Sequence, residues 1–339
     1  MASLKDIAQR CGVSIATVSK ALNGQQDIGE ATKERILRTA QEMGYMANAA
    51  ARALKTNRTY NIGVLLVDLQ NSGLTHEYFA AVLNSFRIEA EREGYDISFI
   101  NSNVGHQNRS YLQHALYRGV DGVAVICVEF QDPMVLELVN SELPVVTLDH
   151  AFHNRSAVLS DNMSGMEALV RFVYSRGHRR LAYIHGDPTA VTESRLTGFY
   201  RACEALGLAV PEAYIGVCHY HEPVSCSEAT KKMLALPERP TCLFLPDDYA
   251  AVGAVNAIHE LGLRIGKDIS IVGYDGMDLA KAMSPRLTTW EQNTAELGRL
   301  AARQLIERIE RPKTTPPEHI VVAGRLLEGD SVARLEQGD

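Results

Sequence analysis

The chain has 339 residues, of which 46% are hydrophobic and 22% are charged, so a disordered, collagen-like or coiled-coil protein is excluded. At roughly 150 residues per domain this length corresponds to two or three packed units, and no apolar run approaches the ~20 residues that span a bilayer. The net charge of −7 is uneven: residues 1–60 contain nine Lys and Arg against five acidic residues (net +4), and the remainder 25 against 36 (net −11). A basic head on an acidic body is typical of a protein that binds nucleic acid.

The N-terminus and the cysteines indicate the compartment. Residues 1–8 lack the apolar stretch of a secretory signal, and the six cysteines are scattered without a Cys-x-x-Cys pair. Free thiols of this kind persist in a reducing environment. We therefore expect a cytoplasmic protein without a membrane partner.

Residues 4–22 have the spacing of two short helices joined by a tight turn. An apolar stripe at every third or fourth position runs over 4–11 and ends at Gly12. Ser14 is a candidate N-cap for a second helix over 15–22. This arrangement predicts a helix-turn-helix motif.

A third helix, predicted over 30–44, completes a small bundle with one core. The side chains expected to face this core from the second and third helices are Val18, Ala21, Leu22, Ile36, Leu37, Ala40 and Met43.

The second helix carries residues suited to reading DNA, since the second helix of such a motif enters the major groove with its N-terminal residues on base edges. Ile15 and Ala16 can pack on a thymine methyl group, and the Lys20 ammonium can donate to guanine O6 and N7. The alternative, a three-helix bundle without a ligand, is disfavoured by the basic bias of the head.

Residues 48–56 favour a helix by composition but are too few to form one alone in water. Leu54 lies between Arg52 and Lys55, which suits insertion of an apolar wedge into a minor groove. An ordinary linker helix is the alternative, and composition alone favours it.

Several motifs of the head resemble those of the lactose/galactose-repressor (LacI/GalR) family. They are Leu-Lys-Asp-Ile-Ala at 4–8, Gly-Val-Ser-x-x-Thr-Val-Ser-Lys-Ala-Leu-Asn at 12–23, Thr-x-x-Arg-Ile at 32–36, Gly-Tyr at 44–45 and Ala-Arg-Ala-Leu at 51–54. The resemblance continues through the whole chain. It implies a homodimeric repressor that binds a pseudo-palindromic operator, with a hinge helix that folds on DNA and a body similar to periplasmic sugar-binding proteins.

The resemblance also implies which residues contact DNA. Leu54 takes the intercalating position, with Lys55 beside it. The family usually has Pro before the hinge Asn, where this chain has Ala47, so the start of the hinge helix is expected to be less rigid. The base-reading positions are Ile15, Ala16 and Lys20, and the phosphate or supporting positions are Ser14, Thr17, Ser19 and Asn23.

From residue 60 onwards, strand-like and helix-like segments alternate. This alternation predicts parallel sheets with right-handed crossovers, and its repetition after residue 160 predicts two doubly wound subdomains. Strands are expected at 61–68, 96–101, 121–128, 144–149, 180–185, 213–218, 241–246 and 268–272, and helices at 77–93, 108–118, 132–141, 163–177, 193–206, 222–235 and 249–261.

The predicted fold class is therefore α/β, with an N-terminal all-α helix-turn-helix head and a periplasmic-binding-protein-like body of two doubly wound parallel-sheet subdomains. The resemblance implies that the chain crosses between the subdomains near Asp161, Trp290 and Ala323. The expected domains are the head at 1–46, a hinge helix and linker at 47–59, an N-terminal effector subdomain at 60–160 with 291–322, and a C-terminal effector subdomain at 161–290 with 323–339.

A ligand cleft is expected between the subdomains, because ligands of open α/β sheets bind beyond the carboxyl ends of the strands. Polar residues that follow predicted strands include Asp149, Asp187 and Asp248. The resemblance assigns the effector-binding residues. Arg195, in Arg-x-x-Gly-Phe, matches an arginine that binds hydroxyls or a carboxylate, Asp275 matches a hydroxyl-binding acid, Asp247 stands where sugar-binding members often have Asn, and Tyr220 matches an aromatic that stacks on the ligand.

This set suits a polyhydroxylated effector, a sugar or sugar derivative, and no cofactor or metal is expected. Sugar phosphates, sugar acids and nucleobases stay open as effectors, as do the direction of the response and the need for a protein corepressor. A sugar-binding transport component is an alternative function, which the 60-residue head opposes. A sugar- or nucleoside-processing enzyme is a third, but no Gly-x-Gly-x-x-Gly loop follows the first strand and no nucleophile–base arrangement is evident.

Overall fold

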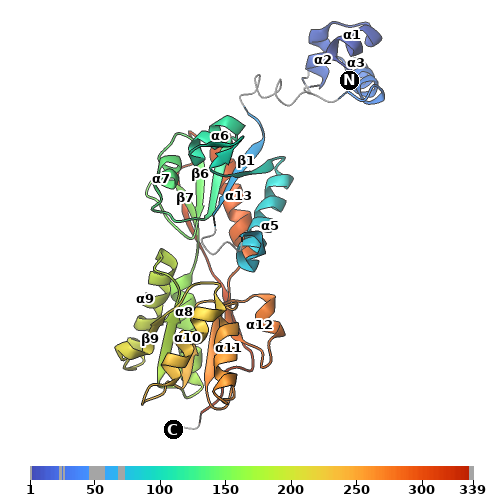
Figure 1. Cartoon of the computed structure of the whole chain (residues 1–339). Coiled ribbons are helices and arrows are strands. Elements are labelled where there is room, and N and C mark those ends of the chain that lie inside the picture. The colour runs from blue at the N-terminus through green and yellow to red at the C-terminus, as the bar shows by residue number, and fades with distance from the viewer. Residues whose placement is uncertain (1, 23–24, 26, 46–57, 68–72, 336–339) are drawn as a thin grey trace. The chain divides into compact units, whose positions relative to one another are not determined.

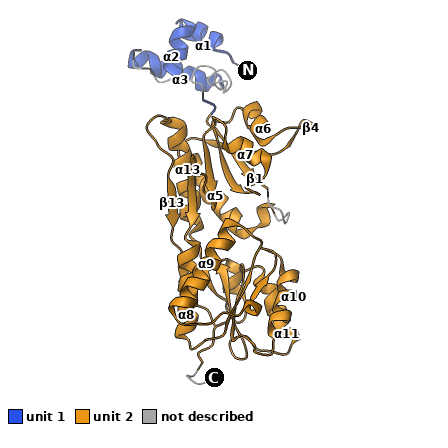
Figure 2. Cartoon of the chain, turned by 90° about the vertical axis from the view of Figure 1, so that its left-hand side faces the viewer, with its two compact units in different colours: residues 1–59 blue, residues 60–339 orange. Residues whose placement is uncertain are grey.

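The computed structural model describes residues 2–22, 25, 27–45, 58–67 and 73–335. They belong to two compact units, residues 1–59 and residues 60–339 (Figure 2). Among these described residues, no helix is both long and apolar enough to cross a membrane. Nor do three or more His, Cys, Asp or Glu side chains in this part of the chain come together as a metal site.

The first unit contains three helices that surround one core. In a capping box at its start, the Ser3 hydroxyl accepts from the Asp6 N–H and the Asp6 carboxylate accepts from the Ser3 N–H. The first helix ends at Gly12, whose φ of 62° is a left-handed conformation that favours glycine. The helices are α1 (Leu4–Cys11), α2 (Ile15–Leu22) and α3 (Glu30–Glu42) (Figure 1).

The core of this unit confirms the predicted apolar positions with one exception. Val18 and Ile36 are fully buried, and Ala40 is 5% exposed. Leu37 is 42% exposed, so its predicted inward orientation is wrong. It lies one position, about 100°, around the helix from Ile36 and outside the stripe that Ile36 shares with Ala40. Thr39 is buried instead, with its hydroxyl donating to a backbone carbonyl of α3.

The first sheet of the second unit has six parallel strands in the order β13-β7-β6-β5-β1-β2. Helices α5 and α13 pack on one face, and α6 and α7 pack on the other. The strands are β1 (Asn61–Leu66), β2 (Asp96–Ile100), β5 (Gly122–Cys127), β6 (Val145–Leu148), β7 (Ser156–Ser160) and β13 (His319–Val322); the helices are α5 (Glu77–Arg92), α6 (Tyr111–Arg118), α7 (Pro133–Val139) and α13 (Thr294–Glu310); and a small hairpin is formed by β3 (Asn103–Val104) and β4 (Gln107–Asn108).

The second sheet has the order β14-β12-β11-β10-β8-β9, and only β14 runs antiparallel to its neighbour. Helices α8 and α9 cover one face, and α10 and α11 cover the other. The strands are β8 (Leu181–His185), β9 (Ile215–Val217), β10 (Cys242–Phe244), β11 (Ser270–Asp275), β12 (Thr288–Glu291) and β14 (Arg325–Leu327); the helices are α8 (Asn162–Ser175), α9 (Ala190–Ala205), α10 (Pro223–Leu234), α11 (Ala251–Glu260) and the short α12 (Asp278–Ala282).

The chain passes between the two sheets after β7, after β12 and after β13 (Figure 1). As a result, elements near the end of the chain complete the first sheet. The side chains that α13 contributes to the core of that sheet are Leu297, Ala301, Ala302, Leu305, Ile306 and Ile309.

The predicted fold class is confirmed, and each segment predicted between 61 and 272 is present with its ends displaced by a few residues. For example, α6 starts at Tyr111 because the Ser110 hydroxyl accepts from the Gln113 N–H and caps it there. The sequence pattern did not predict strands β3, β4, β7, β12, β13 and β14 or helices α12 and α13. The domain boundaries drawn from the sequence stay predictions.

Candidate functional site

Helix α2 presents residues predicted to read DNA. The Ser14 hydroxyl accepts from the Thr17 N–H at 3.0 Å and fixes the start of the helix. Ile15 is 49% exposed, and Ala16 and Lys20 are exposed as well. The N-terminal end of α2 therefore offers an apolar surface followed, about one turn later, by an ammonium group.

The Lys20 side chain is paired within the head. Its Nζ lies 2.5 Å from Asp27 Oδ2, and this hydrogen bond holds the pKa of the Asp27 carboxyl below its usual value. Both side chains are about half exposed, so solvent screens the pair. Ser19 is half-buried. The other predicted DNA contacts, Asn23, Leu54 and Lys55, lie outside the described residues, as does Ala47.

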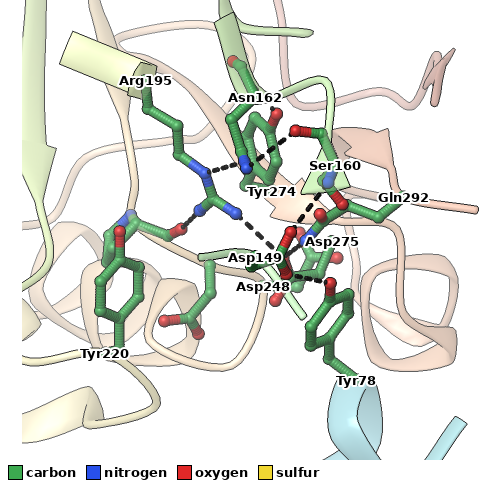
Figure 3. Close-up of polar contacts among 12 residues, drawn as sticks. Tyr78, Asp149, Ser160, Asn162, Arg195, Tyr220, Asp248, Tyr274, Asp275 and Gln292 are labelled. Carbon is green, nitrogen blue, oxygen red and sulfur yellow. Dashed lines mark hydrogen bonds and ion pairs between the residues drawn. The ribbon is translucent and has the colours of Figure 1, made fainter. Parts of the chain in front are cut away.

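Arg195 lies at the centre of a buried polar cluster between the two sheets (Figure 3). Its Nε donates to Asn162 Oδ1 at 2.8 Å, and one Nη donates to the Pro246 carbonyl at 2.8 Å. The other Nη lies 3.6 Å from Asp275 Oδ1. The guanidinium carbon sits 3.6 Å from the centroid of the Tyr274 ring. Arg195 is thus held by the second sheet and by the first turn of α8.

Asp275 ends β11 with a φ of 105°, a strained backbone for a residue other than glycine. Gln292, which follows β12, donates to Asp275 Oδ1 at 2.6 Å. Burial raises the pKa of Asp275 to about 7, and the Arg195 charge opposes this rise. Strain of this kind persists where surrounding contacts fix it, which is typical of ligand sites.

Two adjacent carboxylates follow β10. Asp247 accepts from the backbone N–H groups of His221 and Ala250, so it joins two loops at the edge of the sheet. Asp248 accepts from the Thr289 hydroxyl at 2.7 Å and from a backbone N–H before α12. Asp247 and Asp248 are 4% and 1% exposed.

The first sheet contributes Asp149, which follows β6 and has a φ of 55°. Its Oδ2 accepts from the Tyr78 hydroxyl of α5 at 2.7 Å, and its Oδ1 accepts from the Ser160 N–H at 2.8 Å. In Figure 3 the Tyr78–Asp149 pair lies beside Asp275, opposite the Arg195 side chain. Polar groups that follow strands of both sheets therefore meet in one cluster.

Burial raises the pKa of each carboxyl group of this cluster. The pKa of Asp248 lies well above its usual value, because the neighbouring carboxyl group of Asp275 adds to the effect of burial. In the other three the positive charge of Arg195 reduces the rise without reversing it. The four carboxyl groups are Asp149, Asp247, Asp248 and Asp275.

Tyr220 lies beside the cluster, with its hydroxyl 2.7 Å from the Thr192 hydroxyl. Its ring covers Gly186, where a Cβ atom would come within 2.3 Å of the ring. The ring centroid is 5.8 Å from the Arg195 guanidinium carbon. The absence of a side chain at Gly186 therefore lets Tyr220 approach the cluster.

An aromatic stack joins the two halves of the second unit nearby. The ring of His76, which precedes α5, stacks on that of His221 with centroids 4.1 Å apart. The His221 ring stacks in turn on Tyr249, with centroids 3.9 Å apart. The backbone N–H of His221 donates to the Asp247 carboxylate, and this hydrogen bond connects the stack to the cluster.

A cavity of about 550 Å³ lies at the crossover segments and shares Gln292 with the cluster. Its walls come from both halves, with Glu77 from α5 and Lys281 from α12. The Lys281 ammonium is already paired with Asp278 at 2.9 Å.

The structure thus brings together Arg195, Asp247 and Asp275, with Tyr220 beside them. Their role in binding a ligand stays a prediction.

Sequence reasoning missed three members of the cluster. Asn162 lies two residues after the end of β7 and Gln292 directly after β12, and the sequence pattern predicts neither strand. Tyr78 lies in an amphipathic helix, where nothing in the spacing distinguishes it from a core residue.

Comparison with known proteins follows the same division of the chain. Residues 3–48 match bacterial regulatory proteins of the lacI family, and residues 170–332 match a periplasmic binding protein-like domain. The chain is 34% identical to the HTH-type transcriptional repressor PurR of Escherichia coli, over 98% of this chain and 97% of that protein.

Two solved structures show the similarity in three dimensions. A transcriptional regulator CelR–cellobiose complex is 25% identical, with a TM-score of 0.70 over 98% of this chain and all of that one. The lac repressor dimer bound to operator and the anti-inducer ONPF is 22% identical and shares the fold, with a TM-score of 0.82 over 98% of this chain and 99% of that one.

A helix-turn-helix head and a two-sheet, periplasmic-binding-protein-like body define a DNA-binding transcriptional repressor with a ligand-binding domain. The sequence-based resemblance is confirmed. The chain belongs to the lacI family of bacterial regulatory proteins.

Proposed function

We propose that this protein binds a pseudo-palindromic operator as a homodimer, and that a small polyhydroxylated effector, a sugar or sugar derivative, binds between the two sheets and controls operator binding. The observation that carries the proposal is the cluster around Arg195 and Asp275, in which side chains from both sheets meet. Polar groups from both sheets that meet at one place can close on a ligand held between the sheets. The relative solved with cellobiose supports a carbohydrate as effector.

In this proposal Ile15, Ala16 and Lys20 contact base edges, because they form the exposed face at the start of α2. Arg195, Asp247, Asp275 and Tyr220 contact the effector, and Asp149 with Tyr78 is added from the opposite wall.

Residues 47–59 transmit the effector signal to the head. They lead into Asn61, the first residue of β1, which pairs with β2 and β5 within the first sheet. When the cleft closes, the spacing of the two Asn61 positions in the dimer changes, and this spacing permits or forbids pairing of the hinge segments. Because the segment is too short to fold alone, its order depends on both DNA and the partner subunit.

The outward side of α5 supports the dimer. Ile88 is 52% exposed there, beside Asn84 and Arg87, while Val82 and Phe86 on the opposite side are buried against the sheet. The resemblance to the LacI/GalR family assigns this helix to the dimer interface, and Ile88 is an exposed apolar side chain on it.

The test begins with selection of binding sites from random DNA by the full chain. We expect a two-fold symmetric site, and a carbohydrate that changes the dissociation constant for this site by about 5–150-fold. Lys20→Ala is the matched variant that weakens binding to the site, and Arg195→Ala is the variant that keeps binding to the site and loses the response to the effector. Failure to select any sequence would contradict the operator-binding part. A selected site whose affinity no bound ligand changes would contradict the regulatory part.

A further inference from the structure

The cluster between the sheets contains four carboxyl groups and one guanidinium. Asp247, Asp248 and Asp275 are each less than a tenth exposed, and Asp149 is partly buried. Arg195 is 3% exposed, and its positive charge lowers the pKa of three of these groups, Asp149, Asp247 and Asp275. A buried carboxylate is costly unless it is paired, and one cation cannot pair with four anions. The site therefore has a surplus of acidic groups.

The hydrogen-bonding groups of the cluster show the same excess. Arg195 uses two of its five N–H donors in hydrogen bonds to Asn162 Oδ1 and the Pro246 carbonyl, and its third nitrogen faces Asp275 at 3.6 Å. Gln292 uses its amide nitrogen on Asp275, while its Oε1 is buried without a hydrogen-bond partner although the residue is only 5% exposed. A carboxylate also accepts several hydrogen bonds, about four across its two oxygens. The four carboxyl groups therefore offer more acceptor positions than Arg195 offers free donors, and a ligand that donates hydrogen bonds fits the cluster best.

Three kinds of group can neutralise such a surplus: a metal ion, protons or a cationic ligand. The described residues do not arrange three or more carboxylate, His or Cys side chains as a metal site. Protons fill the role in the free protein, since burial raises the pKa of these carboxyl groups. An anionic ligand would add to the surplus, whereas an ammonium group removes part of it and donates three hydrogen bonds.

We propose that the effector is cationic, a polyhydroxylated molecule that carries a protonated amine, such as an amino sugar, with its ammonium against Asp275 and Gln292 and its hydroxyl groups donating to the remaining carboxylates. This inference rests on the proposed function, because it takes the cluster as the effector site. It excludes sugar phosphates, sugar acids and nucleotides as effectors.

The proposal implies a characteristic pH dependence. The groups that face Asp275 are Arg195, Asp149, Asp247 and Asp248, with Tyr78, Tyr274 and Tyr220 at the edge of the cluster and His221 against Asp247. The ammonium binds the ionised carboxylate, so its affinity rises as Asp275 loses its proton. A neutral sugar donates to either form and depends less on pH.

The test uses the full chain, titrated by calorimetry with matched compounds: glucosamine, galactosamine and mannosamine, their parent sugars, and the 6-phosphates and uronic acids of those sugars. We expect one amine to bind at least about tenfold more tightly than its parent sugar, a difference of about 1.4 kcal/mol. We also expect the affinity to rise from about pH 5 to about pH 7, because Asp275 loses its proton towards its pKa of about 7 while the amine of the sugar is still protonated. Tighter binding of a parent sugar or an anion, or no binding by any amine, overturns the proposal.

Two variants locate the effect. Asp275→Asn removes the charge, keeps the oxygen that accepts from Gln292, and places at the strained φ a residue that tolerates it. It should bring the amine and the parent sugar to similar affinities. Asp96→Asn, an equal charge change on the exposed edge of β2, should leave the preference intact. Should Asp275→Asn fail to fold, Gln292→Met removes the unpaired acceptor instead and should lower the affinity for the amine alone.

The two proposals fail in different ways. An amine that binds the cluster without changing operator affinity contradicts the regulatory role and supports the ligand class. A neutral sugar that binds more tightly than its amine and shifts operator affinity supports the regulatory role and contradicts the ligand class.

Discussion

The Nζ of Lys20 lies 2.5 Å from Oδ2 of Asp27, so the ammonium predicted to contact guanine is paired with a carboxylate of its own head. Both groups are exposed to solvent by about half, and DNA can displace the carboxylate. Base contact by Lys20 therefore competes with an internal partner.

The first prediction follows from this competition. Asp27→Asn should raise the affinity for the selected operator several-fold, because Lys20 no longer has to leave a carboxylate and one acidic group is removed from the DNA-facing unit. Fluorescence anisotropy with operator and random DNA measures the effect. Glu34→Gln removes the same charge from exposed α3 and serves as the control. Equal gains for the two variants would show a general charge effect in place of competition.

The second prediction concerns the base contact itself. Lys20→Ala should weaken operator binding by about 1–3 kcal/mol and random DNA binding by less, because a base contact carries sequence information and a phosphate contact does not. Gel-shift titration with both DNAs decides the matter. Equal losses would show that Lys20 contacts only phosphate.

The third prediction concerns Arg195. Arg195→Ala should abolish the effector response and leave operator binding without effector intact. It should also lower the free energy of unfolding by about 1–3 kcal/mol, since it leaves the buried oxygens of Asn162 and Pro246 without their donor. Leu54→Ala is the complementary variant, expected to weaken the operator complex while keeping effector affinity. Calorimetry, gel shift and chemical denaturation give the three readouts, and a full effector response in Arg195→Ala would place the ligand elsewhere.

The fourth prediction is a stability that falls as pH rises. Burial raises the pKa of Asp275 from its ordinary value of 3.8 to about 7, so between these values the folded state holds a proton that the unfolded chain has lost. Unfolding then releases a proton, and folded-state stability decreases from about pH 4 to about pH 7. Burial lowers the pKa of His150 and His178, which has the opposite effect near their titration.

The Asp275→Asn variant isolates this contribution. Thermal unfolding of ligand-free protein should show a smaller loss of Tm with rising pH in the variant than in the wild type, because the histidines contribute equally to both. If Tm changes with pH equally in the variant and the wild type, Asp275 is ionised in the folded protein over the whole pH range.

The fifth prediction is a homodimer that does not assemble into a tetramer, since residues 326–339 contain no heptad pattern that could join two dimers. Ile88→Glu places a charge on the exposed side of α5 and should shift the monomer–dimer equilibrium towards monomer, and with it operator affinity at low protein concentration. Light scattering at micromolar concentration measures both states. A tetramer of the wild type, or an unchanged dimer in the variant, would contradict this assignment.

The head was predictable in detail because its signals are local. The apolar spacing of α1 and the left-handed Gly12 define the turn within a few residues, and Val18 and Ile36 are buried as predicted. The predicted inward orientation of Leu37 was wrong because neighbouring positions on a helix lie about 100° apart, so one can face the core and the next the solvent. Ile36 and Leu37 are both apolar, and residue type alone does not distinguish them.

The cluster was predictable only in part, because its members come from distant segments. The Tyr78–Asp149 contact joins residues 71 positions apart, and the Gln292–Asp275 contact depends on two adjacent strands of the second sheet. Residue type indicated the carboxylates and Arg195, but the surplus of carboxyl groups emerges only when the burial of each is known.

The late position of α13 has a consequence for biosynthesis. The apolar side of α5, with Val82 and Phe86, is covered by side chains from residues 297–309, and β13 at 319–322 is the last strand of the first sheet. A nascent chain therefore completes its head after some 45 residues but closes the first sheet only when nearly the whole protein has left the ribosome. A product truncated before α13 would carry an intact helix-turn-helix on a body with exposed apolar surface, which makes it a substrate for chaperones and proteases before it can occupy an operator.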